Sequence, residues 1–356
     1  MKHETIQLNG ITYNRTNFDQ LYVSSEPDDS WQNAISFFLQ NWFDETDSVL
    51  ANTSGSTGKP KEIRLTKRAM INSARMTNHF FELNASCTAL LCLPASYIAG
   101  KMMLVRAMVS GFNLLTVEPS ANPFKDLNIP IDFAAITPYQ LIHSAESLRK
   151  VSVKKIIVGG SPVTSKLEQL SENIPSELYE TYGMTETCSH IALRKINGFE
   201  KSDYFTALKG VDIHLDNRGC LVIYAPHLLE YEVHTNDIVE LVSDDSFRWL
   251  GRIDAVINTG GIKIHPNLVE KKLGKIIPVN YFIASVPDMV VENKVVLVLE
   301  SERQTAEEEK ELKTEMEKLL GKFEMPRHIF YIPSFIYSSG NKVLRKETLA
   351  EARKVE

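Results

Sequence analysis

The chain has 356 residues and a net charge of -6, and its 43% hydrophobic and 24% charged residues are typical of a globular protein. This balance excludes a disordered or fibrous chain and supplies no overall basic field for nucleic acid. At about 150 residues per domain, the length predicts one large domain and one smaller domain. No apolar run is long enough for a membrane span and no signal peptide follows Met1, which predicts a cytoplasmic protein. The 4 cysteines lack metal-ligand spacing and are predicted to be reduced thiols.

The first part of the chain alternates short apolar runs with amphipathic stretches, as is typical of an α/β fold with mostly parallel strands. Met70 and Ala74 lie on one face of a helix predicted over residues 66–81. Strands are predicted at 88–93, 114–117, 133–137 and 155–158. Ser161 followed by Pro162 is typical of a helix start and predicts a helix up to residue 170.

The strongest local signal is residues 53–61, TSGSTGKPK. Glycines let backbone amides approach phosphate oxygens, hydroxyls donate further hydrogen bonds, and lysines add positive charge. The alternatives are a flexible Gly/Ser turn and a Walker P-loop, but the Walker spacing of two glycines followed by Lys and Ser or Thr is not met. The candidate phosphate-binding residues are Thr53, Ser54, Gly55, Ser56, Thr57, Gly58 and Lys59.

A second candidate segment is YGMTET at 182–187, which follows a glycine turn at residues 159–162. Tyr182 offers an aromatic face for adenine, Thr185 a hydroxyl for a phosphate, and Glu186 a hard oxygen for Mg²⁺. In an isolated pattern, Tyr182 could equally be a core residue and Glu186 an exposed carboxylate. The candidate nucleotide-binding residues of the turn are Gly160, Ser161 and Pro162.

The character of the sequence changes after residue 219, where shorter predicted strands at 221–224 and 238–242 indicate a small barrel-like portion. Beyond residue 252, strands are predicted at 281–286 and 295–299, together with a helix whose start Thr305 and Glu308 mark as a capping box. The predicted domains are therefore 1–252 and 253–356.

Together these segments resemble the motifs of the adenylate-forming superfamily of acyl-CoA synthetases, adenylation domains and luciferases. TND at 235–237 resembles its ribose-binding motif, with Asn236 in place of a glycine, and GRID at 251–254 resembles its hinge. The following glycine-bearing loop holds Gly260 and Gly261, and GNKVLR at 340–345 resembles the terminal motif with its lysine at Lys342.

The resemblance implies a large N-terminal domain of stacked, mostly parallel sheets with helices, and a small mobile α+β C-terminal domain. It implies ATP and Mg²⁺ as ligands, Asp237 and Arg252 near the ribose, Asp254 as the hinge, and the Gly260–Gly261 loop facing coenzyme A. Lys342 would neutralise the repulsion between a carboxylate and the α-phosphate, which is roughly 4 kcal/mol for unit charges 4 Å apart at an effective dielectric of 20. Only 52 residues precede the phosphate loop, so, compared with the family it resembles, we expect the first domain to be shortened at its start.

The wider segment YGMTETCSH at 182–190 is more similar to the 2-succinylbenzoate:CoA ligases of menaquinone synthesis than to other branches. This resemblance implies that 2-succinylbenzoate is activated as an acyl adenylate and passed to coenzyme A. Tyr97 stands where that branch carries a histidine, and Tyr97 and Gly159 are candidate substrate residues. A second substrate carboxylate needs a buried cationic partner, for which Lys101 and His190 are the candidates.

Three alternatives remain open at this point. The chain could be another aryl-acid:CoA ligase, a stand-alone aryl-acid adenylation enzyme that loads a carrier protein, or a nucleotide-binding module without catalysis. The expected partners are a small carboxylic acid, ATP and CoA, without nucleic acid or a membrane span, and the sequence leaves the oligomeric state open.

Overall fold

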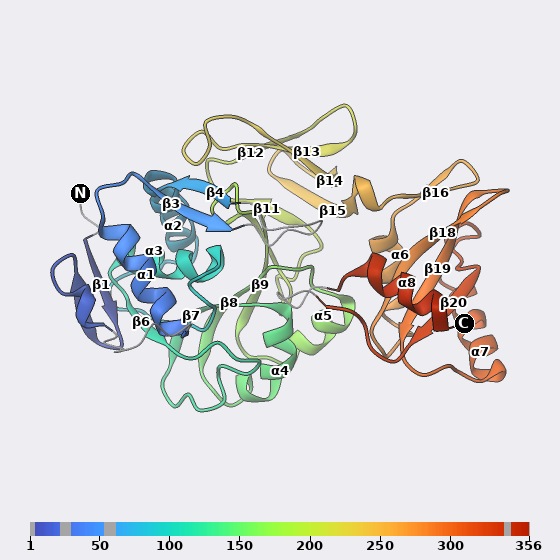
Figure 1. The fold of residues 1–356 in the computed structure, drawn as a ribbon, viewed down its shortest axis with the longest axis horizontal. Helices are drawn as coiled ribbons and strands as arrows, with labels where there is room; N and C mark the ends of the chain where they lie inside the picture. The colour runs from blue at the N-terminus through green and yellow to red at the C-terminus, as the bar shows by residue number, and fades with distance from the viewer. Residues whose placement is uncertain (1–3, 22–29, 53–61, 338–342, 356) are drawn as a thin grey trace.

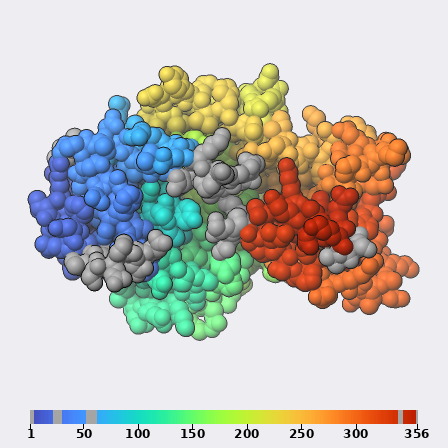
Figure 2. All heavy atoms as spheres, viewed as in Figure 1, coloured from blue at the N-terminus to red at the C-terminus, as the bar shows by residue number. Residues whose placement is uncertain are grey.

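The computed structural model describes residues 4–21, 30–52, 62–337 and 343–355. They form a large lobe, up to residue 252, and a terminal lobe, from residue 257, that lie side by side in Figures 1 and 2, with the terminal lobe in orange and red. Each lobe has its own sheet and its own apolar clusters. We place the domain boundary, as a proposal, between these two sheets.

The large lobe is built on one 13-stranded sheet, in which the strands towards one edge are parallel. In spatial order, the mutually parallel strands are β9 (Glu177–Gly183), β8 (Val153–Val158), β7 (Ile131–Ile136), β5 (Thr88–Leu91), β6 (Asn113–Thr116) and β1 (Thr5–Leu8). β2 (Ile11–Asn14) adds an antiparallel edge strand beside β1.

Helices cover both faces of the parallel strands, which is why these strands are apolar on both sides. Phe133 and Ala135 of β7 belong to the apolar cluster that contains α1 (Trp31–Phe43), α2 (Lys67–Phe80) and α3 (Ile98–Ser110). Ala134 and Ile136 of the same strand belong to the cluster that contains α4 (Pro138–Leu148) and α5 (Ser165–Ser171). The mixed α/β fold expected from the sequence is confirmed.

Beyond β9 the same sheet continues with antiparallel strands only. They are β10 (His190–Lys195), β11 (Phe205–Ala207), β12 (Asp212–Leu215), β13 (Cys220–Tyr224), β14 (Val233–Leu241) and β15 (Ser246–Arg252). Within the described residues this portion extends the open sheet and does not close into a barrel.

Two short features complete the large lobe. β3 (Ser48–Asn52) and β4 (Glu62–Thr66) form an antiparallel pair in which Asn52 lies opposite Glu62, so both ends of the 53–61 loop start from one ladder. η1 (Phe18–Gln20) precedes α1. The predicted helix start at Ser161 is wrong: Thr164 is the N-cap, its side chain accepts from the N–H of Leu167, and α5 begins at Ser165.

The terminal lobe packs helices on a five-stranded sheet. η2 (Ile253–Ala255) connects the two lobes. The elements of the terminal lobe are β16 (Ile257–Thr259), β17 (Ile262–Ile264), α6 (Pro266–Leu273), β18 (Tyr281–Asp288), β19 (Glu292–Glu300), α7 (Ala306–Glu317), β20 (His328–Ile332) and α8 (Arg345–Val355). The predicted capping box of Thr305 and Glu308 is confirmed at the start of α7. None of the helices in the described ranges is long and apolar enough to cross a membrane.

Candidate functional site

The glycine turn and the YGMTE segment meet at one edge of the sheet. β8 and β9 are parallel neighbours, with Val158 opposite Glu180, so their carboxyl ends leave the sheet together. Gly159 and Gly160 follow β8, and Gly160 has a φ of +92°, which glycine adopts without strain. Ligands of open α/β sheets bind outside the carboxyl ends of strands, so this edge is the candidate nucleotide site.

Gly183 lets the YGMTE segment turn back tightly into β10. A Cβ atom at residue 183 would lie 2.4 Å from the carbonyl oxygen of Ser189 and 2.5 Å from the Cα of His190. The return loop also holds Cys188 at a φ of +63°, an uncommon conformation for a non-glycine residue. The backbone of the motif is therefore held in an uncommon shape by close contact with β10.

Tyr182 and Asp237, which are far apart in the sequence, are hydrogen-bonded partners. The Tyr182 hydroxyl donates to Asp237 Oδ2 over 2.7 Å, and Trp249 Nε1 donates to Asp237 Oδ1 over 3.1 Å. Burial, followed by the charge of Asp237, raises the pKa of Tyr182, so the phenol is neutral. The ring also packs edge-on against Phe247, which makes Tyr182 part of an apolar cluster as well as a candidate adenine contact.

Asp237 lies in β14 opposite Arg252 of β15. Asn236 sits within β14, where its amide oxygen accepts from Arg218 over 3.2 Å. The resembled motif has a glycine at this position, but the backbone at Asn236 is extended within β14 and needs none. The pairing of β14 with β15 therefore places both predicted ribose residues, Asp237 and Arg252, next to Tyr182.

Arg252 and Asp254 form an ion pair where the chain leaves the large lobe. Arg252 Nε and Nη2 donate to the two Asp254 carboxylate oxygens, each over 3.0 Å. The hydrogen bond from Arg252 is the main reason why the pKa of Asp254 lies below its usual value. Both side chains are partly exposed, so this contact can break at little cost.

Thr185 and Glu186 lie in the loop after β9, where the side chain of Glu186 is exposed. Within the described residues Glu186 has no hydrogen bond or ion pair, so its carboxylate is free for a cation. One carboxylate fits Mg²⁺, which takes most of its other ligands from water and phosphate oxygens. Among all the residues that the structure describes, no group of three or more His, Cys, Asp or Glu side chains could hold a metal ion.

The candidate substrate residues at the start of α3 have other contacts. Tyr97 is the N-cap residue of α3 and is exposed. Lys101 Nζ donates to the carbonyl of Leu50 over 2.6 Å, and burial lowers the pKa of Lys101. Because Leu50 belongs to β3, Lys101 supports the strand that leads into the 53–61 loop.

Arg106 is a buried cation that the motif analysis did not select. It lies in the middle of α3 with 1% of its surface exposed, and burial lowers its pKa to about 9. Its Nη2 donates to Ser189 Oγ over 2.7 Å, whereas no hydrogen-bond partner of Nε is found in the described chain. Among the described residues Arg106 forms no ion pair, which is unusual for a buried arginine. The signal in the sequence is a single charge within the apolar run 102–109.

His190 is joined to Arg106 through Ser189. His190 Nδ1 lies 3.3 Å from Ser189 Oγ, and His190 Nε2 lies 3.3 Å from Thr77 Oγ1. Burial, and next the positive charge of Arg106, holds the pKa of His190 well below its usual range. His190 is therefore neutral near pH 7 and can accept a hydrogen bond, but it supplies no positive charge for a carboxylate.

Two predicted groups lie outside the described residues. These are the phosphate loop, Thr53, Ser54, Gly55, Ser56, Thr57, Gly58 and Lys59, and the terminal lysine, Lys342. Gly260 and Gly261 lie in the β16–β17 hairpin, and a Cβ at Gly260 would touch Phe323 and Val291 of the terminal lobe.

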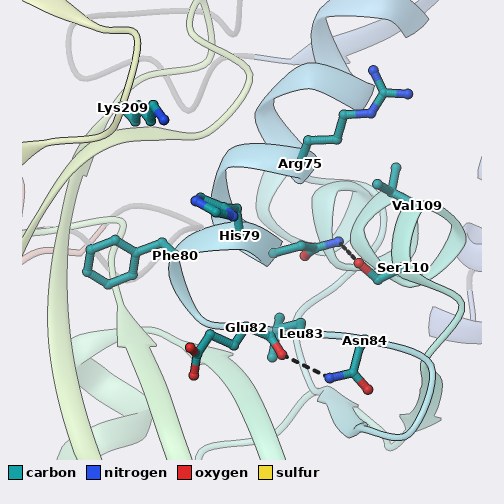
Figure 3. Close-up of a pocket in the computed structure, with 10 residues that line it drawn as sticks. Arg75, His79, Phe80, Glu82, Leu83, Asn84, Val109, Ser110 and Lys209 are labelled. Carbon is teal, nitrogen blue, oxygen red and sulfur yellow. Dashed lines mark hydrogen bonds between the residues drawn. The ribbon is translucent and has the colours of Figure 1, made fainter.

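A separate groove of about 870 Å³ lies at the end of α2 (Figure 3). His79 and Lys209 face each other across it, with Phe80 and Glu82 on its wall. None of the predicted site residues lines this groove. Its connection to the residues above is Asn78, whose amide donates to the backbone carbonyl of Arg106 over 2.9 Å.

Comparison with known families matches the description "AMP-binding enzyme" to residues 6–217. A solved chain of similar length, an acyl-CoA synthetase (AMP-forming)/AMP-acid ligase II-like protein from Dyadobacter fermentans, is 32% identical. That match covers 96% of this chain and 99% of the other, with a TM-score of 0.61.

The curated relatives include the 2-succinylbenzoate–CoA ligases of Escherichia coli and Lactococcus lactis. Each is 23% identical to this chain over 83% and 85% of its length, and this chain spans 66% and 71% of theirs. The o-succinylbenzoate coenzyme A synthetase of Bacillus subtilis, solved in complex with ATP and magnesium ion, is 21% identical with a TM-score of 0.69. That match covers 84% of this chain and 69% of the other.

Proposed function

Because the chain belongs to the AMP-binding enzyme family, we propose that it is an AMP-forming acid–CoA ligase. It activates 2-succinylbenzoate with ATP as an acyl adenylate and transfers the acyl group to coenzyme A, a step of menaquinone biosynthesis. The relatives named for this ligation and their solved complexes support the choice of acid. The four free cysteines suit the reducing cytoplasm, where ATP and CoA are made.

The buried guanidinium of Arg106 is the observation that carries the choice of a dicarboxylate. A charge that is removed from water without an ion partner is costly, so a protein keeps one where a ligand supplies the partner. The acid activated here has a second carboxylate, and Arg106 can bind it with two parallel hydrogen bonds. Ser189 accepts from Nη2 of the guanidinium, and neutral His190 lies 3.3 Å from the same hydroxyl.

The nucleotide binds, in this proposal, along the edge formed by the glycine turn, Tyr182 and Asp237. Tyr182 offers a ring face to adenine, Asp237 accepts from the ribose hydroxyls, and Arg252 donates to a ribose oxygen. Thr185 and the 53–59 loop donate to the phosphates. Glu186 would hold Mg²⁺, which would supply positive charge next to the phosphates.

Attack by a carboxylate on the α-phosphate brings two negative charges together, and Lys342 is the residue assigned to neutralise them. Removal of one preorganised donor of this kind costs roughly 10² to 10³ in rate. After pyrophosphate leaves, the terminal lobe turns about Asp254, which withdraws Lys342 and presents the Gly260–Gly261 loop to the thiol of CoA. Hinges of this kind consist of a few residues that absorb the backbone change.

The test is a panel of acids with ATP, Mg²⁺ and CoA, in which AMP release and thioester mass are measured together. We expect 2-succinylbenzoate to give both products and a monocarboxylate analogue to give at most a few per cent of that rate. Lys342→Ala should abolish adenylate formation and spare transfer from a preformed adenylate to CoA. AMP release without thioester would instead identify an enzyme that loads a carrier protein, and a preference for the monocarboxylate would exclude the proposed acid.

A further inference from the structure

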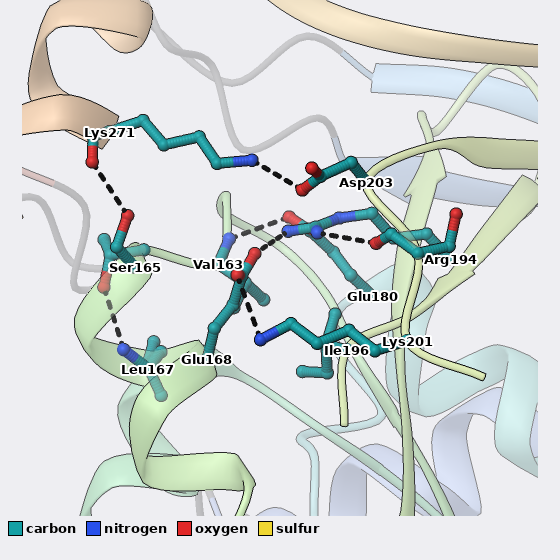
Figure 4. Close-up of polar contacts among 12 residues, drawn as sticks. Val163, Ser165, Leu167, Glu168, Glu180, Arg194, Ile196, Lys201, Asp203 and Lys271 are labelled. Atoms are coloured by element: carbon teal, nitrogen blue, oxygen red, sulfur yellow. Dashed lines mark hydrogen bonds and ion pairs between the residues drawn. The ribbon is translucent and has the colours of Figure 1, made fainter. Parts of the chain in front are cut away.

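Three buried charged side chains form a network of hydrogen bonds and ion pairs (Figure 4). Arg194 of β10 donates from Nε to Glu180 Oε2 of β9 over 2.5 Å and from Nη2 to Glu168 Oε1 of α5 over 2.7 Å. Burial alone would lower the pKa of Arg194, but the charges of Glu180 and Glu168 outweigh it and raise that pKa. We call Glu168, Glu180 and Arg194 the buried triad.

One side of the buried triad holds the nucleotide edge. The second oxygen of Glu180, Oε1, accepts from the backbone N–H of Val163 over 2.7 Å, and Val163 directly follows the 159–162 turn. The Arg194 guanidinium lies 5.6 Å from the ring centroid of Phe205, which in turn lies 5.8 Å from the ring of Tyr182. The triad therefore contacts the supports of both the turn and the candidate adenine residue.

The other side of the buried triad holds the surface against which the terminal lobe packs. Arg194 Nη1 donates to the carbonyl of Ser202 over 3.2 Å, and the next residue, Asp203, forms an ion pair with Lys271 of α6 over 2.7 Å. Glu168 lies on α5, the helix that also carries Ser165 and Lys166.

α5 itself makes two further bonds to the terminal lobe. Ser165 Oγ donates to the carbonyl of Lys271 over 3.2 Å, and Lys166 Nζ donates to the carbonyl of Pro278 over 2.9 Å. Gly274 fits closely there, since a Cβ at that position would lie 2.9 Å from the Cβ of Ser165. The segments that the triad fixes are thus the same segments that bear these contacts.

We propose that the buried triad is a positioning device that couples the nucleotide turn to the docking of the terminal lobe. The inference rests on the proposed function, in which the nucleotide occupies that turn and the terminal lobe changes orientation between two steps. An arginine is needed because its planar fork reaches Glu180, Glu168 and Ser202 at once, whereas a lysine is a single point donor.

Calorimetric titration with AMP tests the coupling in the full chain. Lys271→Met removes the partly exposed ion pair with Asp203, which touches none of the candidate nucleotide residues, and should weaken AMP binding about two- to fivefold, the range expected for one surface pair. The matched control is Lys150→Met, which removes an exposed ion pair with Glu146 on α4 and should leave AMP binding unchanged.

Arg194→Lys keeps the buried charge but loses the fork, and in that background Lys271→Met should have no further effect on AMP binding. A merely structural role would lower the melting temperature and leave AMP affinity and this non-additivity untouched. Effects of Lys271→Met that persist in full in Arg194→Lys would overturn the proposal. If Arg194→Lys does not fold, Glu168→Gln replaces it, because it keeps the Arg194–Glu180 pair and weakens only the link to α5.

The unaltered chain separates the two levels of inference. If none of the acids in the panel makes it release AMP from ATP, the proposed function fails. The AMP titrations then still decide whether the nucleotide turn and the terminal lobe are coupled. If it forms the thioester and all the titrations are additive, the coupling fails and the proposed function stands.

Discussion

Arg106 lies inside α3 with a single hydroxyl partner, Ser189, and a sulfur atom, that of Met103, 3.5 Å from its Nη1. A buried charge of this kind lowers stability, because water solvated it in the unfolded chain and little replaces that water in the folded one. Such a cost is tolerated at sites where activity needs it. Stability and substrate affinity should therefore respond in opposite directions when this side chain is changed.

Arg106→Met should raise the KM for 2-succinylbenzoate about 10- to 100-fold, the loss expected for hydrogen bonds to a charged group worth about 1.5–3 kcal/mol. The free energy of unfolding should stay the same or rise by about 1–3 kcal/mol, because the substitution removes an unpaired buried charge. Steady-state kinetics and urea unfolding measure the two quantities, with the exposed Arg149→Met as control. An equal rise in KM for a monocarboxylate would exclude Arg106 from the second-carboxylate site.

His190 predicts a pH dependence of stability. Burial and the charge of Arg106 hold the pKa of His190 below its ordinary value. Below about pH 6.5 the imidazole is therefore protonated in the unfolded chain but stays neutral in the folded chain. The free energy of unfolding should thus fall as the pH drops from 6.5 towards 5, by at most about 1.4 kcal/mol per pH unit from this group. Urea unfolding of His190→Gln across that range should show a smaller slope, and an unchanged slope would contradict a buried neutral imidazole.

Among the elements, the turn between β9 and β10 depends on a missing side chain. Gly183→Ala places a methyl group within 2.4 Å of the Ser189 carbonyl oxygen, and overpacking of this kind costs about 1–3 kcal/mol. The melting temperature should fall. The rate of AMP release should also fall, because Thr185 and Glu186 lie in the same turn, two and three residues after Gly183. Gly321→Ala is the control, since its nearest contact would be an ordinary 3.5 Å. A Gly183→Ala chain as stable as the unaltered one would show that the turn can relax.

Elements with local signals were predictable from sequence. The helical period of residues 66–81 corresponds to α2 (Lys67–Phe80), and the Thr305–Glu308 pair marks the start of α7. The helix start predicted at Ser161 was wrong because a serine before a proline is also common in loops. Thr164, three residues later, has the same capping chemistry and is the N-cap. Local rules could not choose between two good N-caps.

The features that the sequence did not predict depend on contacts between segments that are far apart in the chain. The hydrogen bond from Tyr182 to Asp237 depends on the sheet order that brings β9 and β14 into one lobe, which no short pattern encodes. Arg106 was visible only as a break in an apolar run, and the period of α3 does not say which neighbour that charge meets. Arg194, in contrast, lies directly opposite the carboxylate of Glu180 on β9. Its second carboxylate partner, Glu168, comes from α5, which packs beside these strands.

On the scale of the whole molecule, the polar contacts of α5 and Asp203 with the terminal lobe hold one orientation of that lobe. The proposed reaction needs two orientations, and the chain between the sheets is short, with η2 (Ile253–Ala255) as its only regular turn in the described residues. A substitution that stiffens this connection should affect the two half-reactions unequally.

Asp254→Pro should spare adenylate formation, followed by pyrophosphate exchange, and slow CoA thioester formation at least tenfold, because proline fixes the backbone angle φ at residue 254. Asp254→Ala is the matched control: it also loses the ion pair with Arg252 but keeps the backbone free, so thioester formation should continue. If both substitutions slow the two half-reactions alike, the pivot lies elsewhere.

The first strand of the large sheet has a consequence for how the protein is made. β1 lies between β2 and β6, with Leu8 opposite Leu114, so its parallel neighbour leaves the ribosome more than a hundred residues later. At about 5–20 residues per second, the nascent hairpin of β1 and β2 waits roughly 5–20 s for that neighbour. During translation this exposed edge is the place where a chaperone, or a bulky fusion at the amino end, would compete with native assembly.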